Sequence, residues 1–174
     1  MILTGYEIEK QHEEGAIVIE PFCKEQLNPN SYDLRLGNQL LIYDEDELSP
    51  KKDNKYHIET IPEDGYVLKK GHFYLASSVE EIGGTKFVPL IHAKSGIARL
   101  GLFVHITADL IDVGYVGTTT FQLYPTVDIR VFPNMKIGQV SFWTIKGDVE
   151  LYHGKYQGSN GPQHSKSYMS FKNE

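Results

Sequence analysis

Short runs of β-branched and aromatic residues follow one another along almost the whole chain, and most of them end at Gly, Pro, Asn or Asp. Segments such as Leu27-Asn28-Pro29-Asn30 and Pro133-Asn134 are typical turns between strands. Many short strands without helices between them favour a sandwich, barrel or jelly roll. The sequence therefore predicts an all-β fold, with strands at residues 16–20, 31–36, 39–43, 66–68, 73–77, 87–92, 102–107, 118–124, 129–132 and 138–145.

Helix signals are confined to two places. Thr4-Gly5-Tyr6-Glu7 has the pattern of a capping box, which predicts a short N-terminal helix that runs to about Glu14 and stops at Gly15. Residues 95–100, with the sequence SGIARL, predict a single helical turn between two strands.

Composition limits the kind of protein. A chain of 174 residues with 40% apolar residues is enough for one domain with its own core. Its single cysteine, Cys23, excludes an intramolecular disulfide and a thiolate-rich zinc site. We expect a cytoplasmic protein without a leader or a membrane span, because no apolar run approaches the roughly 18 residues that a span needs.

The net charge of −6 argues against nucleic acid as a partner, because a long row of phosphates would be repelled. The net charge does not argue against a single triphosphate as a ligand, because a few basic side chains, backbone N–H groups and a divalent cation can hold it.

Two segments look external to the core. Residues 44–55 are charged and poor in large apolar side chains, which predicts an exposed loop. The tail of residues 154–174 is rich in Gly, Ser, Lys and Asn and would be disordered alone. It still carries Tyr156, Tyr168 and Phe171, which could anchor it to a surface.

Three stretches could carry chemistry, and each also has a plain structural interpretation. Residues 94–101 combine Lys94, Ser95 and Arg99 near a turn, which suits a phosphate but also an ordinary capped turn. Asp112 lies just before a Gly-bearing turn, where a carboxylate can orient a water or merely cap its own loop. Lys155 and Tyr156 in the tail could contact a phosphate and cover a ring, or belong to a frayed terminus.

Two histidines are weaker candidates. His105 fits a half-buried structural histidine better than a catalyst. His92-Ala93-Lys94 lacks the Glu and the paired cysteines of a zinc deaminase, so any deamination must proceed without zinc at the base.

The order of the motifs is more specific than any one of them. The segments NPNSYDLRLG, KSGIARLGL, VHITADLIDVGYVGTTTFQL, FPNMKIGQVSF and GKYQGSNGPQHSKSY closely resemble the dCTP deaminase family, nearly end to end. That family is related to the trimeric dUTPases, whose pattern is visible in Lys94-Ser95-Gly96 and in Ile111-Asp112.

The resemblance implies a distorted jelly roll or β-barrel of the dUTPase kind, with a body at residues 1–153 and a mobile C-terminal arm at residues 154–174. It also implies a homotrimer with active sites between subunits, and Mg²⁺ held through the substrate phosphates without protein ligands.

By the same resemblance, each candidate residue receives a role. Lys94, Ser95 and Arg99 would contact phosphates, and Arg99 would also support catalysis. Asp112 would contact the deoxyribose and orient a water, while the backbone at Thr107 and Ala108 would face the pyrimidine. The closing arm would supply three further residues: Tyr152, Lys155 and Tyr156.

One departure bears on activity. Where the deaminases carry a Glu that moves protons between water and base, this chain has Gln122. An amide cannot take a proton from water, and general acid–base groups contribute about 10²–10⁴ in rate. Ser159 and Pro125 are lesser departures, at positions where the family usually has Gln and Asn. The replacement at Gln122 is compatible with natural divergence and with a deliberate inactivating change.

Three functions are compatible with these residues. The first, favoured because of Gln122, is a diphosphatase that converts dUTP or dTTP to the monophosphate and pyrophosphate. The second is a dCTP deaminase, active through another base or inactive as a Glu-to-Gln variant. The third is a nucleotide-binding regulator without catalysis.

Overall fold

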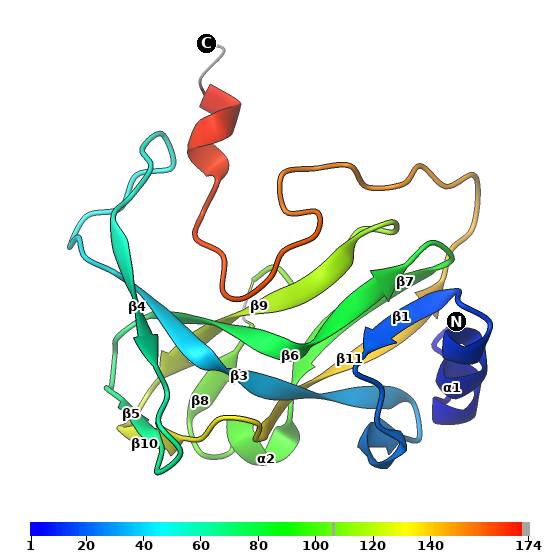
Figure 1. Cartoon of the computed structure of the whole chain (residues 1–174), viewed down its shortest axis with the longest axis horizontal. Coiled ribbons are helices and arrows are strands. Elements are labelled where there is room, and N and C mark those ends of the chain that lie inside the picture. The colour runs from blue at the N-terminus through cyan, green and yellow to red at the C-terminus, as the bar shows by residue number, and fades with distance from the viewer. Residues whose placement is uncertain (106, 172–174) are drawn as a thin grey trace.

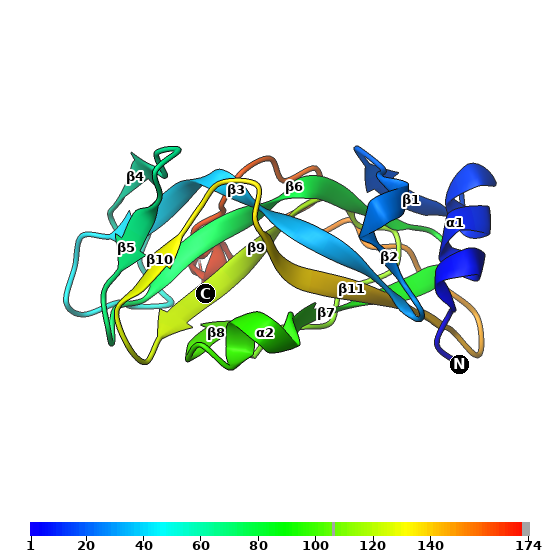
Figure 2. The ribbon, with the colours of Figure 1, turned by 90° about the horizontal axis from the view of Figure 1, so that it is seen from below.

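The computed structural model describes residues 1–105 and 107–171 and confirms the all-β fold (Figure 1). Every strand pairing among these residues is antiparallel. Nine strands form one barrel-like sheet with β7, β11, β3, β6, β9 and β8 in that spatial order, while β1 pairs with β6 and both β2 and β4 pair with β3. A separate pair, β5 and β10, lies at one end of the molecule (Figure 2).

The strand bounds follow the sequence pattern closely in most places. The strands are β1 (Ile17–Glu20), β2 (Leu27–Asn28), β3 (Ser31–Tyr43), β4 (Tyr56–Thr60), β5 (Tyr66–Leu68), β6 (Tyr74–Gly84), β7 (Phe87–Ala93), β8 (Leu102–Val104), β9 (Val116–Pro125), β10 (Ile129–Val131) and β11 (Lys136–Thr144). The expected strand at 102–107 includes Ile106, which lies outside the described residues.

The N-terminal helix α1 (Gly5–Glu13) begins as the capping pattern predicts. Thr4 Oγ1 accepts a hydrogen bond from the N–H of Glu7 at 3.3 Å. The Glu7 carboxylate accepts from Gln11 Nε2 at 2.9 Å, so it stabilises the buried face of the helix. Gly15 ends the turn at φ 76°, a conformation that glycine adopts without strain.

Three further short helical segments are η1 (Lys24–Gln26), α2 (Ser95–Ala98) and η2 (Ser167–Phe171). Of these, the single turn α2 was expected from SGIARL. None of the helices that the structure describes is long and apolar enough to cross a bilayer.

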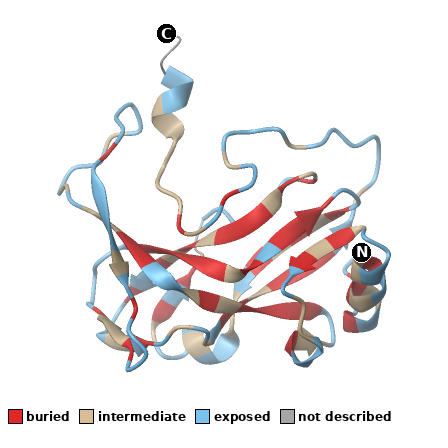
Figure 3. Cartoon of the chain, viewed as in Figure 1, coloured by how far each residue is buried: buried red, intermediate tan, exposed pale blue. Residues whose placement is uncertain are grey.

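The core lies between the faces of the curved sheet (Figure 3). Tyr32, Phe121 and Phe142, on β3, β9 and β11, have no exposed surface. Burying one such side chain fully contributes about 1.5–3 kcal/mol, so these three strands form the stable frame of the molecule. The frame holds the candidate site, because β9 continues from the core to the cavity described below.

The structure differs from the sequence prediction at four strands. Strand β2 occupies the first half of the expected turn Leu27-Asn28-Pro29-Asn30 and pairs with β3. The two expected strands at 31–36 and 39–43 are one strand, β3, with a register shift between Leu36 and Leu40. Strand β4 was not predicted, because its residues are mostly exposed and it has no apolar alternation. Strand β6 runs past its charged stretch because Glu80, fully buried, accepts from the Arg35 N–H at 2.9 Å and forms an ion pair with its guanidinium at 2.6 Å.

The exposed loop at 44–55 joins β3 to β4 and has a defined shape. Asn54, 5% exposed, accepts from the N–H of Ser49 at 2.9 Å and donates to the carbonyls of Ser49 and Lys52. Glu45 pairs with Lys52 and accepts from the N–H of Lys55. One buried amide side chain therefore satisfies the backbone at the tip of this hairpin.

Candidate functional site

A cavity of about 540 Å³ lies between the sheet and the C-terminal segment that crosses it (Figure 1). Its walls come from the body and from the arm. The body contributes Tyr43, Leu48, Phe73, Leu75, His105, Ala108, Leu110, Ile111, Asp112, Tyr115, Thr118, Thr119, Thr120, Gln122 and Tyr152, and the arm contributes Tyr156, Ser159, Gln163, His164 and Ser165.

Asp112 reaches the cavity from a tight turn. The N–H of Tyr115 donates to the Asp112 carbonyl at 3.2 Å, and the N–H of Gly114 donates to Gly84 at 2.7 Å. Gly114 has φ 95°, and a Cβ there would lie 2.7 Å from the backbone N of Tyr152. Only glycine fits this position, because the arm passes directly over the turn. The turn thus places a carboxylate and the start of the arm at the same side of the cavity.

Gln122 faces the same cavity from β9, within reach of the loop that follows β8. Thr107 Oγ1 and Gln122 Oε1 lie 3.3 Å apart, and the N–H of His105 donates to the Gln122 carbonyl at 3.2 Å. Thr107 therefore touches the site through Gln122, whereas Ala108 lines the cavity itself. Thr107 contacts the side-chain amide of Gln122 and His105 its backbone, and the side-chain amide carries both a donor and an acceptor.

His105 is half-buried, with a left-handed backbone at φ 62°. Burial lowers the pKa of its imidazole, against the opposing effect of a hydrogen bond to the Ala108 carbonyl. Its buried Nδ1 has no hydrogen-bond partner among the described residues. The ring is therefore neutral at pH 7 and lines the cavity as an uncharged polar group.

The arm is attached along the first half of β9. Gln157 Oε1 accepts from the N–H of Val116 at 3.0 Å, and its Nε2 donates to the Gly114 carbonyl at 2.8 Å. The N–H of Thr118 donates to Ser159 at 2.9 Å, and that of Gln163 donates to Thr120 Oγ1 at 3.0 Å. The expected tail of residues 154–174 is thus ordered through residue 171, and its last three residues lie outside the described part.

Two of the three arm residues singled out from the sequence lie at the cavity. The Tyr152 hydroxyl accepts from the N–H of Tyr156 at 3.1 Å, and the Tyr156 hydroxyl accepts from the N–H of Lys166 at 2.9 Å. Lys155 does not line the cavity; its Nζ donates to Ser170 at 3.1 Å and lies 5.9 Å from the centre of the Tyr156 ring. Both of these partners of the Lys155 side chain, Ser170 and Tyr156, belong to the arm itself.

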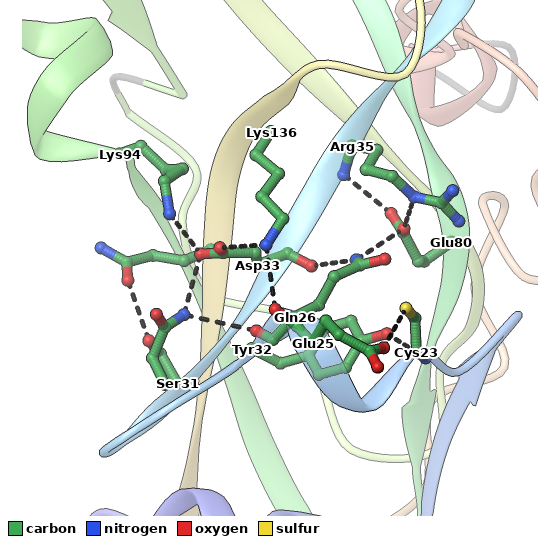
Figure 4. A network of polar contacts seen from close by, with 12 residues as sticks. Cys23, Glu25, Gln26, Ser31, Tyr32, Asp33, Arg35, Glu80, Lys94 and Lys136 are labelled. Atoms are coloured by element: carbon green, nitrogen blue, oxygen red, sulfur yellow. Dashed lines mark hydrogen bonds and ion pairs between the residues drawn. The ribbon is translucent and has the colours of Figure 1, made fainter.

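The predicted phosphate cradle is separate from the cavity within one chain. Ser95 begins α2, and Lys94 and Arg99 are the residues that flank this helical turn. The turn lies below the sheet in Figure 1, while the arm crosses above the sheet. Lys94 Nζ donates to the buried Asp33 carboxylate at 2.6 Å, and Lys136 Nζ lies 3.3 Å from the other oxygen of that carboxylate (Figure 4). Arg99 Nη1 donates to the Ser95 carbonyl at 3.1 Å.

The cavity has no cation to match a phosphate. Among its described lining residues there is no lysine and no arginine, and its carboxylate is that of Asp112. A triphosphate bound by this chain alone would meet negative charge without compensation. The geometry therefore suits a base and a sugar inside the cavity, with the phosphates directed outward.

Several wall residues were not found from the sequence. Tyr43 and Leu48 lie at the β3–β4 hairpin, and Phe73 and Leu75 lie on or beside β6, far from the other motifs in sequence. Gln163 and His164 fall within the quoted tail motif, which is the signal that could have identified them. The hairpin residues carry no such local signal, because only the path of the arm brings them to the site.

Comparison with known proteins assigns the chain to a family. A family model described as dCTP deaminase-like matches residues 2–145. A protein of Hathewaya histolytica named "dCTP deaminase, dUMP-forming" is 44% identical over 98% of this chain and 99% of its own length. One of the same name from Cytophaga hutchinsonii is 45% identical over the same shares of the two chains.

A solved structure, the 2′-deoxycytidine 5′-triphosphate deaminase from Agrobacterium tumefaciens, supports the fold. It superposes with a TM-score of 0.66 at 22% identity, over 81% of this chain and 47% of that one. The chain thus spans about half the length of that protein, and the likeness concerns the fold.

The names of the relatives contradict the function favoured from Gln122. Proteins 42–45% identical over nearly the whole chain are named for dCTP deamination, not for dUTP or dTTP diphosphatase activity. The physical reason is that an amide carries both a donor and an acceptor, so Gln122 does not select a 4-oxo base over a 4-amino base. Because the family model matches residues 2–145 and these relatives match nearly the whole chain, the chain belongs to the dCTP deaminase-like family.

Proposed function

We propose that the protein converts dCTP, with two waters, into dUMP, ammonia and pyrophosphate. The observation that carries the proposal is a cavity that brings Asp112, Gln122 and Ala108 together under an arm, in a chain related end to end to proteins named dUMP-forming dCTP deaminases. The dimensions suit one nucleoside, since ligand cavities are typically about 300–1,000 Å³.

The reaction needs two attacks by water. In the first, water adds to C4 of the cytosine ring and the C4–N bond breaks, so that ammonia leaves with the transferred protons. In the second, water attacks the α-phosphorus and pyrophosphate leaves. Asp112 orients the second water, and the arm excludes bulk solvent from both steps.

Gln122 determines how fast the first step runs. An amide can bind the base edge or the attacking water, but it cannot accept the proton. The remaining proton acceptors on the described cavity wall are the carboxylate of Asp112 and the imidazoles of His105 and His164. We therefore expect ammonia release to be slow, and a nucleotide-binding regulator is the second candidate function.

We also propose that Mg²⁺ is bound through the substrate phosphates. The ion would take its ligands from phosphate oxygens and water, and it would supply positive charge at the leaving pyrophosphate.

We further propose that a second copy supplies the phosphate contacts. The described part of the cavity wall has no lysine or arginine, while Ser95 and Arg99 are exposed and do not line the cavity. Near them, Leu100 and Phe103 are 59% and 52% exposed, as expected for apolar side chains that another subunit covers. A homotrimer with shared sites satisfies both features.

Product analysis with dCTP, dUTP and dTTP in the presence of Mg²⁺ tests this function. Equal amounts of ammonia and pyrophosphate from dCTP support the proposal. Tight dCTP binding without either product supports the regulator. Pyrophosphate from dCTP without ammonia, or no binding of dCTP, contradicts the proposed reaction.

A further inference from the structure

The tip of the arm rests on the hairpin between β3 and β4. The Tyr43 hydroxyl accepts from the N–H of Ser165 at 2.9 Å. The Tyr56 ring stacks on His164 with centroids 4.7 Å apart and an interplanar angle of 25°. His164 Nε2 lies 3.3 Å from Asp53 Oδ1. These three contacts fix two consecutive residues of the arm, and both of those residues line the cavity.

The contact continues to the last described residues. Lys51 Nζ lies 5.3 Å from the centre of the Phe171 ring. Burial and the neighbouring Asp53 carboxylate raise the pKa of Tyr168. The segment Ser167–Phe171 (η2) thus stands beside the hairpin, as the two projecting segments in Figure 1 suggest.

The hairpin and the arm carry opposite net charges. Residues 44–55 carry five acidic and three basic side chains, whereas residues 154–171 carry two lysines and no acidic side chain. The buried Asn54 amide holds the hairpin through hydrogen bonds made within the hairpin itself. A hairpin of negative net charge therefore meets a tail of positive net charge.

We propose that the hairpin of residues 43–56 is the docking site of the arm tip, residues 164–171. Tyr43, Asp53 and Tyr56 act as positioning residues that hold the arm over the cavity. The catalytic consequence rests on the proposed function, whereas the docking itself does not. When these contacts are lost, the arm opens, dCTP binds more weakly, and the wall made by His164 and Ser165 is absent.

Limited trypsin digestion at Lys155 and Lys166 tests the docking without any nucleotide. Tyr56→Ala should speed cleavage about twofold to tenfold, as expected for loss of one stacked pair. Asp53→Asn should speed it about twofold to fivefold, as expected for loss of one partly exposed ion pair. Asp46→Asn makes the same charge change at an exposed position of the same hairpin and should cleave at the wild-type rate. Tyr56→Phe keeps the ring and should restore protection.

Kinetics with dCTP test the positioning role. Tyr56→Ala should raise KM by the same factor as the cleavage rate, with a smaller change in kcat, and Tyr56→Phe should restore both. The docking would be overturned if Asp53→Asn and Tyr56→Ala were cleaved at the wild-type rate. It would also be overturned if Asp46→Asn raised the cleavage rate as much as they do. Faster cleavage with an unchanged KM would overturn the positioning role. If the wild type binds no dCTP, the proposed function fails, while the digestion still decides the docking.

Discussion

Lys94 Nζ lies 2.6 Å from Oδ1 of Asp33, a carboxylate that is 3% exposed on β3. The same carboxylate accepts from Asn28 Nδ2 at 2.8 Å and pairs with Lys136 at 3.3 Å. An ammonium group has three donors, so Lys94 can keep this contact and still bind a phosphate. The ion pair ties the predicted cradle to the core of the sheet.

Asp33→Asn should lower the free energy of unfolding by about 2 kcal/mol, because two lysines lose their shared countercharge. Urea denaturation measures the loss. Lys24→Met, which breaks an exposed ion pair with Glu9, serves as the control and should leave the free energy of unfolding close to that of the wild type. A loss in Asp33→Asn no larger than this control would show that the cluster contributes little.

The same substitution has a pH signature. Burial raises the pKa of Asp33, but the hydrogen bonds and charges of Lys94, Asn28 and Lys136 outweigh it, and the pKa lies below its ordinary value. The stabilisation is therefore present above the ordinary pKa and is lost as the pH falls from there through the folded-state pKa. The stability gap between wild type and Asp33→Asn should close in that acidic range.

Gln122→Glu should raise ammonia release from dCTP about 10²–10⁴-fold, because a carboxylate can move protons where the amide cannot. A coupled ammonia assay measures the gain. Gln163→Glu places the same charge elsewhere on the cavity wall and should give no gain. An unchanged rate in Gln122→Glu would mean that this position does not handle the proton.

Asp112→Asn should reduce dUMP formation at least about 10²-fold, because the water loses its orienting carboxylate. The Kd for dCTP, measured by calorimetry, should stay within about threefold of wild type if the carboxylate acts mainly in the transition state. Asp109→Asn, nearby but outside the cavity, is the control. Full activity in Asp112→Asn would remove this residue from the mechanism.

Mixed assemblies test whether sites are shared between copies. Arg99→Ala and Asp112→Asn should each be inactive, yet unfolding and refolding them together should restore activity to about one quarter of its sites if each site draws on two subunits. Size-exclusion chromatography with light scattering should give the mass of a trimer. Mixtures as inactive as their components would place every site within one subunit.

The sequence predicted the strands with turn signals at both ends, such as β5 and β7, and the capped helix α1. It did not predict β4, because an exposed strand carries little apolar pattern. It also grouped Lys94 and Arg99 with Asp112, whereas within one chain neither lines the cavity that Asp112 lines, because the order of motifs carries no information on spatial distance. The hairpin wall was missed for a related reason: Tyr43 and His164 are 121 positions apart, and only the path of the arm joins them.

Gln122 illustrates how much one side chain can indicate about a reaction. Its amide cannot accept a proton, which bears on the rate of proton transfer. It does not by itself identify the base, because an amide can be turned to present either edge. The similarity along the whole chain carries more information about the substrate than one side chain does.

The origin of the product oxygens tests the proposed reaction most directly. The protein is incubated with dCTP and Mg²⁺ in water enriched in ¹⁸O, and the products are analysed by mass spectrometry. Two attacking waters predict dUMP with ¹⁸O at the C4 carbonyl and a second ¹⁸O on the α-phosphate of dUMP. A monophosphate that keeps its 4-amino group and is labelled at phosphate alone would contradict the account.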